Sequence, residues 1–167
     1  MKLFALLITI LLSVSCNGSR TEEFVTNIRS ADELFRQGKD EEAMNALVRA
    51  EKCYNEDIPS AALGSLKMRK GDIYYRYFDY AKAIGSYEEG TEIFLASGDT
   101  LNYCNALLLL CDASILNLDA SRAHKCISIM NENARFYHGQ SEHAYHLCRI
   151  KLTELEDGAE AAVPLID

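Results

Sequence analysis

The chain has 167 residues, of which 49% are hydrophobic and 25% are charged. This composition suits one ordinary domain, and it argues against a disordered chain and against a wholly membrane-embedded one. The formal net charge of −8 repels phosphate groups, and no dense basic cluster offsets it, so we expect no binding to nucleic acid.

The N-terminal segment, residues 1–15, has the form of a signal peptide. A single basic residue, Lys2, is followed by an apolar run over residues 3–12 and then by small residues. The apolar run is too short to span a bilayer comfortably, as is typical of the hydrophobic part of a signal peptide. We therefore expect the mature chain to start after this segment.

The sequence Leu-Ser-Val-Ser-Cys at residues 12–16 resembles a bacterial lipobox. This resemblance implies a lipid on Cys16, a polar tether over residues 16–21, and anchoring in the bacterial cell envelope at the periplasmic face of the inner or outer membrane. Ser13 replaces the aliphatic residue that is usual at its position. Plain secretion after cleavage before Cys16 and an uncleaved signal anchor therefore remain as alternatives.

Apolar residues recur at three- and four-residue spacing through the rest of the chain, which predicts amphipathic helices. Asp40 and Asp119 are the expected N-caps of the second and sixth helices, while Gly98 ends the fourth helix and Asp99 begins the cap of the fifth. Seven helices are expected, at residues 22–37, 40–54, 60–77, 80–97, 101–117, 120–136 and 142–156.

The helices belong to a repeat of 40 residues. Shifting the chain by this distance superposes Ala43, Ala83 and Ala123. A fixed period of this size is the signature of a stacked helical solenoid. We expect an all-α solenoid over residues 22–156, made of three helix pairs and a C-terminal half-repeat helix. A tail over residues 157–167 follows, because Pro164 stands where the next helix would have to continue.

The middle repeat resembles the tetratricopeptide repeat, a helix-turn-helix family. The first repeat keeps part of the pattern and the third keeps less, and the period exceeds the 34 residues usual in the family. The whole chain also resembles bacterial tetratricopeptide lipoproteins and the extracytoplasmic half of repeat-containing regulators. The matching residues are Gly71, Tyr74, Phe78, Asp79, Tyr80, Ala83, Tyr87 and Gly90, with Gly38, Ala43, Leu47 and Ala50 in the first repeat and Ala123 in the third.

The resemblance implies a concave groove, lined by the first helix of each pair, that binds a peptide or a partner helix. Three aspartates recur in it and could read a basic or amide-rich ligand. A simpler interpretation is that Asp32 and Asp72 form ion pairs with the arginines four residues later. The expected groove residues are Asp32, Phe35, Arg36, Met68, Asp72, Tyr75, Arg76, Asn105, Leu108 and Asp112.

The cysteines and histidines do not predict a catalytic or metal centre. Five cysteines remain beyond Cys16, an odd number without a C-x-x-C pair, so we interpret them as small side chains in helix seams. A disulfide between neighbouring helices, such as Cys104 with Cys111, is the alternative. His143 and His146 are three apart but lack an acidic third ligand, so we expect no metal and no cofactor.

We find no nucleophile elbow, phosphate-binding glycine loop or H-E-x-x-H motif, so we expect no enzymatic activity. The sequence favours a non-enzymatic scaffold that binds a protein or peptide while anchored to a membrane. The alternative is the extracytoplasmic sensory part of a signalling or transcriptional regulator, truncated or separated from its output domain.

Overall fold

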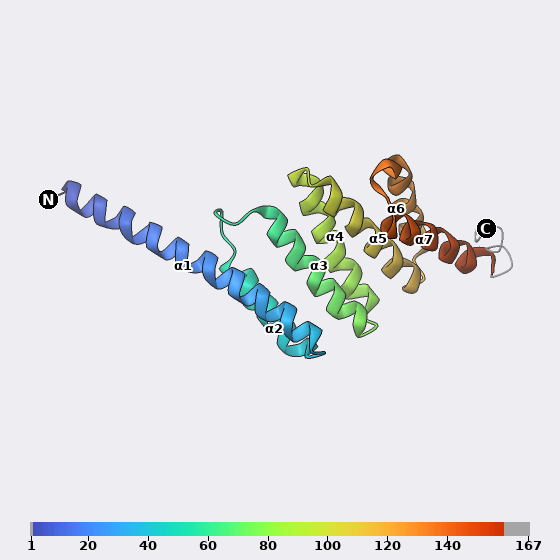
Figure 1. Ribbon diagram of the computed structural model, residues 1–167, viewed down its shortest axis with the longest axis horizontal. Coiled ribbons are helices and arrows are strands. Elements are labelled where there is room, and N and C mark those ends of the chain that lie inside the picture. The colour runs from blue at the N-terminus through green and yellow to red at the C-terminus, as the bar shows by residue number, and fades with distance from the viewer. Residues whose placement is uncertain (1, 159–167) are drawn as a thin grey trace. The chain divides into compact units, whose positions relative to one another are not determined.

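The computed structural model describes residues 2–158, with side chains from residue 18 onward. This part of the chain is all-helical and has no strand, so the expected all-α class is confirmed. The tail expected at residues 157–167 lies almost wholly outside it. The elements are α1 (Lys2–Arg36), α2 (Asp40–Cys53), α3 (Ser60–Arg76), α4 (Tyr80–Ser97), α5 (Thr100–Leu116), α6 (Ala120–Glu132), the short 3-10 helix η1 (Ala134–Phe136) and α7 (Gln140–Asp157) (Figure 1).

The chain divides into two compact units, Met1–Leu66 and Lys67–Asp167. In unit 1, α1 packs along α2. Small side chains on α2 allow the close approach of the two helices, because Ala43, Ala46 and Ala50 are fully buried. Arg49 of α2 also donates from Nε to the side-chain oxygen of Asn27 on α1 over 3.1 Å.

The N-terminal segment differs from the expected layout. The backbone of α1 is helical without interruption from Lys2 to Arg36, so the polar run expected as a tether at residues 16–21 lies inside this helix. The side chain of Cys16 lies outside the described residues. Among the described residues, no helix is both long enough and apolar enough to cross a membrane.

The turns that follow α1, α3 and α5 share one backbone geometry at an interval of 40 residues. Gly38, Phe78 and Leu118 each have positive φ, at 74°, 61° and 61°. The next residue in each turn donates its backbone N–H to a carbonyl five residues earlier, over 2.9, 3.0 and 2.8 Å. Only glycine adopts positive φ without steric cost, so the second and third turns hold bulky residues in a conformation that glycine would relieve.

The helix caps agree with the sequence in all but one case. Asp79, Asp99 and Asp119 are the N-caps of α4, α5 and α6, and each accepts a backbone N–H from three residues later. Gly98 ends α4 in the left-handed conformation, as expected. The prediction that Asp40 caps α2 is wrong: Lys39 holds the cap position, and Asp40 is the buried first residue of the helix.

In unit 2, α5 is the central helix. It packs against α4, α6 and α7, and its side chains are buried on most sides. Leu107, Leu108 and Leu110 are buried, whereas Leu109 remains 39% exposed. This arrangement leaves two faces of α5 for other elements: α4 and α6 lie against one, and α7 packs against another.

Candidate functional site

Three helices of unit 2 are joined by a polar network centred on Asp112 of α5. The hydroxyl of Tyr75 on α3 donates to Oδ2 of Asp112 over 2.5 Å. Lys151 on α7 contacts Oδ1 of the same carboxylate from Nζ, also over 2.5 Å. Both oxygens of Asp112 are therefore occupied by partners from the two neighbouring helices.

This network shifts the titration of its donors. Burial, together with the hydrogen bond to Asp112, raises the pKa of the Tyr75 hydroxyl well above its ordinary range. Burial alone would lower the pKa of Lys151, but the hydrogen bond and the charge of Asp112 outweigh burial and raise it. Tyr75 thus stays protonated and Lys151 stays charged near neutral pH, which is the state that the network requires.

A second expected groove carboxylate, that of Asp72, also has an internal partner. Its Oδ1 accepts the hydroxyl of Tyr87 over 2.8 Å. Burial raises the pKa of Asp72, and the hydrogen bond from Tyr87 offsets part of that rise. In unit 1, the expected groove residue Arg36 forms an ion pair with Glu33, three residues earlier, over 2.6 Å.

The expected groove residues divide between the two units. Asp32, Phe35 and Arg36 belong to α1 in unit 1, and the other seven belong to α3 and α5 in unit 2. Leu108 is buried, and its carbonyl lies 3.9 Å from the Cys148 sulfur of α7. Arg36, Arg76 and Asn105 are exposed, and Asp32, Phe35, Met68, Asp72, Tyr75 and Asp112 are half-buried.

An open pocket of about 440 Å³ lies between α4 and α6 in unit 2. Its floor comes from α5, and α4 and α6 supply its two walls. Apolar side chains dominate the floor and the deeper walls, while charged side chains stand at the rim. The lining residues are Glu88, Thr91, Glu92, Leu95, Tyr103, Leu107, Leu110, Asp119, Ser121, Arg122, Lys125, Cys126 and Ile129.

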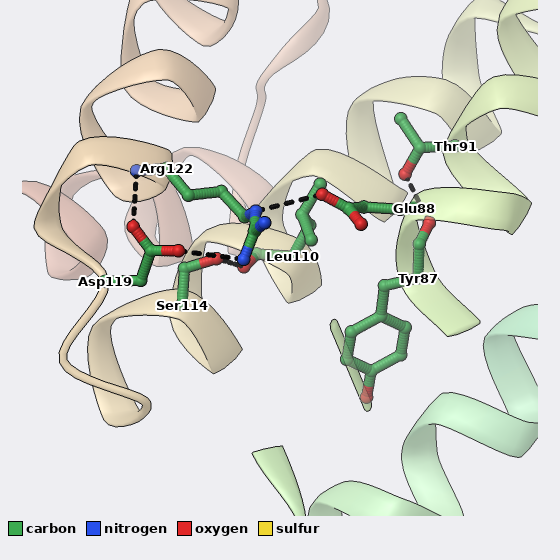
Figure 2. A network of polar contacts seen from close by, with 7 residues as sticks. All are labelled: Tyr87, Glu88, Thr91, Leu110, Ser114, Asp119 and Arg122. Atoms are coloured by element: carbon green, nitrogen blue, oxygen red, sulfur yellow. Dashed lines mark hydrogen bonds and ion pairs between the residues drawn. The ribbon is translucent and has the colours of Figure 1, made fainter. Parts of the chain in front are cut away.

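Arg122 links the two walls of this pocket, as Figure 2 shows. Its Nε lies 2.9 Å from Oε1 of Glu88 on α4, and its Nη1 lies 2.8 Å from Oδ2 of Asp119. Asp119 also accepts the backbone N–H of Arg122 over 3.0 Å, so the cap of α6 holds the guanidinium in place. The pocket therefore has a fixed ionic bridge beside an apolar floor.

The sequence analysis did not single out this pocket, although a signal for it exists. On α4 the lining residues Glu88, Thr91, Glu92 and Leu95 follow the spacing of one helical face, and on α6 the residues at 122, 125, 126 and 129 do the same. Such stripes are visible in a sequence. The space between two stripes depends on how the helices pack, which one sequence does not contain.

Within residues 18–158, no group of three histidine, cysteine or acidic side chains is placed to hold a metal ion. His143 and His146 are both exposed on α7. The five cysteines in this range are free thiols, and all five are buried.

Comparison of the chain with protein-family models, curated proteins and solved structures finds no match. Its function is therefore inferred from its own residues.

Proposed function

We propose that this chain is a non-enzymatic scaffold that binds a protein or peptide, built as a solenoid of tetratricopeptide-like repeats. The recurrence of one turn geometry at Gly38, Phe78 and Leu118 supports the repeat. The network in which Asp112 contacts α3 and α7 supports an array whose first helices lie side by side. Repeat arrays of this kind present extended surfaces for binding rather than a catalytic centre.

The pocket between α4, α5 and α6 is the best candidate for the binding site, and it is the observation on which the proposal depends. It is open, and its volume of about 440 Å³ suits one or two side chains of a partner. Leu95 stands at its wall with 60% of its surface exposed. Covering such a side chain with an apolar group is favourable by about 25 cal/mol for each Å² removed from water.

The charged rim indicates the chemistry of the partner. Three carboxylates line the pocket, from Glu88, Glu92 and Asp119, against two cations, from Arg122 and Lys125. We therefore propose that the ligand is a peptide segment with an apolar side chain beside a basic one. The net charge of −8 of the whole chain favours the approach of such a segment.

The inner face of α3 and α5 is the weaker candidate. Its two carboxylates, on Asp72 and Asp112, already accept hydrogen bonds from Tyr87 and Tyr75. A ligand that used them would have to replace these internal partners, which adds a cost that the open pocket does not have.

We also propose that the scaffold is held on the outer side of a bacterial membrane by a lipid on Cys16. The support is the signal-peptide form of residues 1–15 and the lipobox-like sequence at residues 12–16. This location places the binding site in the cell envelope and its thiols in an oxidising compartment.

The experiment is a selection of displayed random peptides on the full-length chain in detergent. We expect the enriched peptides to share an apolar residue beside Lys or Arg. Their affinities are then measured by fluorescence anisotropy for the natural chain and for two variants. Leu95→Glu places a charge at the pocket wall, and Leu101→Glu is the matched control, because Leu101 is 63% exposed but lies outside the pocket.

Leu95→Glu should weaken binding by at least about tenfold, since burying a leucine contributes roughly 1.5–3 kcal/mol. Leu101→Glu should leave the affinity unchanged. Equal affinities for all three proteins would refute the pocket. Loss of binding in Asp72→Ala with Tyr75→Ala, while Leu95→Glu binds normally, would move the site to the inner face.

A further inference from the structure

Three thiols from three helices meet in the core of unit 2: Cys111 of α5, Cys126 of α6 and Cys148 of α7. Their exposed fractions are 0%, 2% and 4%, and they belong to one apolar cluster. The Cys111 sulfur lies 3.8 Å from the carbonyl of Ala123, and the Cys148 sulfur lies 3.9 Å from the carbonyl of Leu108. Cys111 thus faces α6, and Cys148 lies against α5 one helical turn before Cys111.

Cys111 and Cys148 are in direct contact, because their side chains hydrogen-bond to each other. One turn further along the same seam, Lys151 of α7 contacts Asp112 of α5 over 2.5 Å. The seam between α5 and α7 is therefore held at neighbouring positions by a polar pair and by a thiol pair. Two cysteines on packed helices whose sulfurs touch can reach disulfide geometry by rotation of their side chains, with a bond of about 2 Å.

We propose that Cys111 and Cys148 form a disulfide that fixes α7 to α5 in the cell envelope. The inference depends on the proposed location outside the cytoplasm, and it is independent of the proposed peptide binding. The thiols are the reduced form of this pair. The bond would close a loop of roughly 40 residues, and closing a loop of that size stabilises a fold chiefly by restricting the unfolded chain.

The reaction is a thiol–disulfide exchange with a disulfide oxidoreductase or a small disulfide such as oxidised glutathione. The thiolate of one cysteine attacks the oxidant's disulfide, which releases one thiol and forms a mixed disulfide. The second cysteine then displaces the oxidant's other sulfur and completes the bond. Two electrons and two protons pass from the cysteine pair to the oxidant, which leaves as a dithiol or as two thiols.

Electrostatics assigns the attacking thiol. The hydrogen bond from Cys111 lowers the pKa of Cys148, whereas the same bond and burial raise the pKa of Cys111. Burial also raises the pKa of Cys126 to about 12, so the third thiol is a poor competitor for the oxidant. Because both members of the pair are buried in the folded chain, the bond should form while α7 docks.

The test begins with refolding of the full-length chain, purified in detergent, reduced and denatured. It is refolded in a mixture of reduced and oxidised glutathione, and free thiols are then blocked with N-ethylmaleimide in acidic denaturant. Mass spectrometry of a non-reduced digest should find the peptides of Cys111 and Cys148 linked, with Cys53, Cys104 and Cys126 alkylated. Two free thiols at Cys111 and Cys148, or a link from either to another cysteine, would overturn the proposal.

The second measurement compares thermal unfolding of chains refolded with glutathione and with a phosphine reductant. The oxidised natural chain should melt higher by on the order of 10 °C. Cys104→Ala, a matched buried thiol, should keep this difference, and Cys148→Ala should abolish it. If all three proteins respond alike, the proposal fails, and if Cys148→Ala does not fold, the digest of the natural chain decides.

The same digest of the chain isolated from the bacterial envelope tests the location. A linked pair after refolding together with free thiols in envelope material would overturn the disulfide in the cell and the location on which it depends. That result would leave the peptide-binding pocket unaffected, because neither Leu95 nor its neighbours on α4 take part in the bond.

Discussion

Gly71 of α3 offers a sharp test of packing in unit 2. A Cβ added at this position would lie 2.3 Å from Cε1 and 2.5 Å from Cδ1 of Tyr87. Tyr87 is 1% exposed, and its hydroxyl is held by Asp72, the residue after Gly71, so the ring cannot move away freely. Gly71→Ala must therefore displace a buried tyrosine and strain its hydrogen bond.

The magnitude follows from opposing contributions. Overpacking costs about 1–3 kcal/mol, and disturbing a hydrogen bond to a buried carboxylate costs about 1.5–3 kcal/mol more. Replacing glycine by alanine in a helix returns about 1 kcal/mol. We expect Gly71→Ala to lower the free energy of unfolding by about 2–4 kcal/mol.

Gly85 in α4 is the matched control, because a Cβ there meets nothing within 4 Å. Gly85→Ala should raise the free energy of unfolding by about 0.5–1 kcal/mol, since only helix propensity changes. Both values come from urea denaturation followed by circular dichroism. If Gly71→Ala stabilises the chain as Gly85→Ala does, the close contact with Tyr87 does not exist.

A second substitution should rescue the first. Forty residues earlier, the positions of Gly71 and Tyr87 are occupied by Ala31 and Leu47, which are 2% and 1% exposed. The smaller residue thus stands with the larger partner in the second repeat, and the larger with the smaller in the first. Adding Tyr87→Leu to Gly71→Ala should therefore cost less than the sum of the two single changes.

Four further predictions follow from single features. Asp112→Ala should lower the free energy of unfolding by about 2 kcal/mol, because the half-buried Tyr75 loses a charge-assisted acceptor; a loss below about 0.5 kcal/mol in urea denaturation would contradict the network. Burial raises the pKa of Asp72 above 3.8, so this carboxyl favours the folded state at low pH and loses that contribution as pH rises through its folded pKa. Relative to Asp72→Asn, the natural chain should thus become less stable between about pH 3 and 6, and a constant difference would refute this shift. Leu118→Asn should raise the melting temperature by a few degrees, because Leu118 has positive φ and is 74% exposed, and asparagine tolerates that conformation. Cys16→Ala should release the chain from membranes and abolish its labelling by radioactive palmitate; unchanged labelling would exclude lipidation at Cys16.

The sequence predicted helices and turns well, because their signals are local. Asp79, Asp99 and Asp119 cap helices through bonds that span three residues, and the 40-residue period places equivalent turns at Gly38, Phe78 and Leu118. Asp40 was assigned wrongly because its chemistry suits a cap as well as a first-turn position, and the choice between neighbouring positions is the weakest part of such reasoning.

The candidate site could be predicted much less well. The stripes on α4 and α6 that line the pocket are visible as helical spacing, but an equally regular stripe can face solvent or a neighbouring helix. The ionic bridge from Arg122 to Glu88 joins residues of two helices that are not consecutive in the chain. Only the packing of both helices on α5 brings those side chains together.

The recurring aspartates show why periodicity fixes a position but not a role. Asp72 and Asp112 are equivalent in the repeat, yet they have different partners. Asp72 accepts the hydroxyl of Tyr87 from the same repeat, whereas the equivalent of Tyr87 in the next repeat is Ile127, which has no donor. The carboxylate of Asp112 is instead satisfied by Tyr75 from the preceding repeat and Lys151 from the following helix. One substitution in the repeat thus converts a bond within a helix pair into a link across three helices.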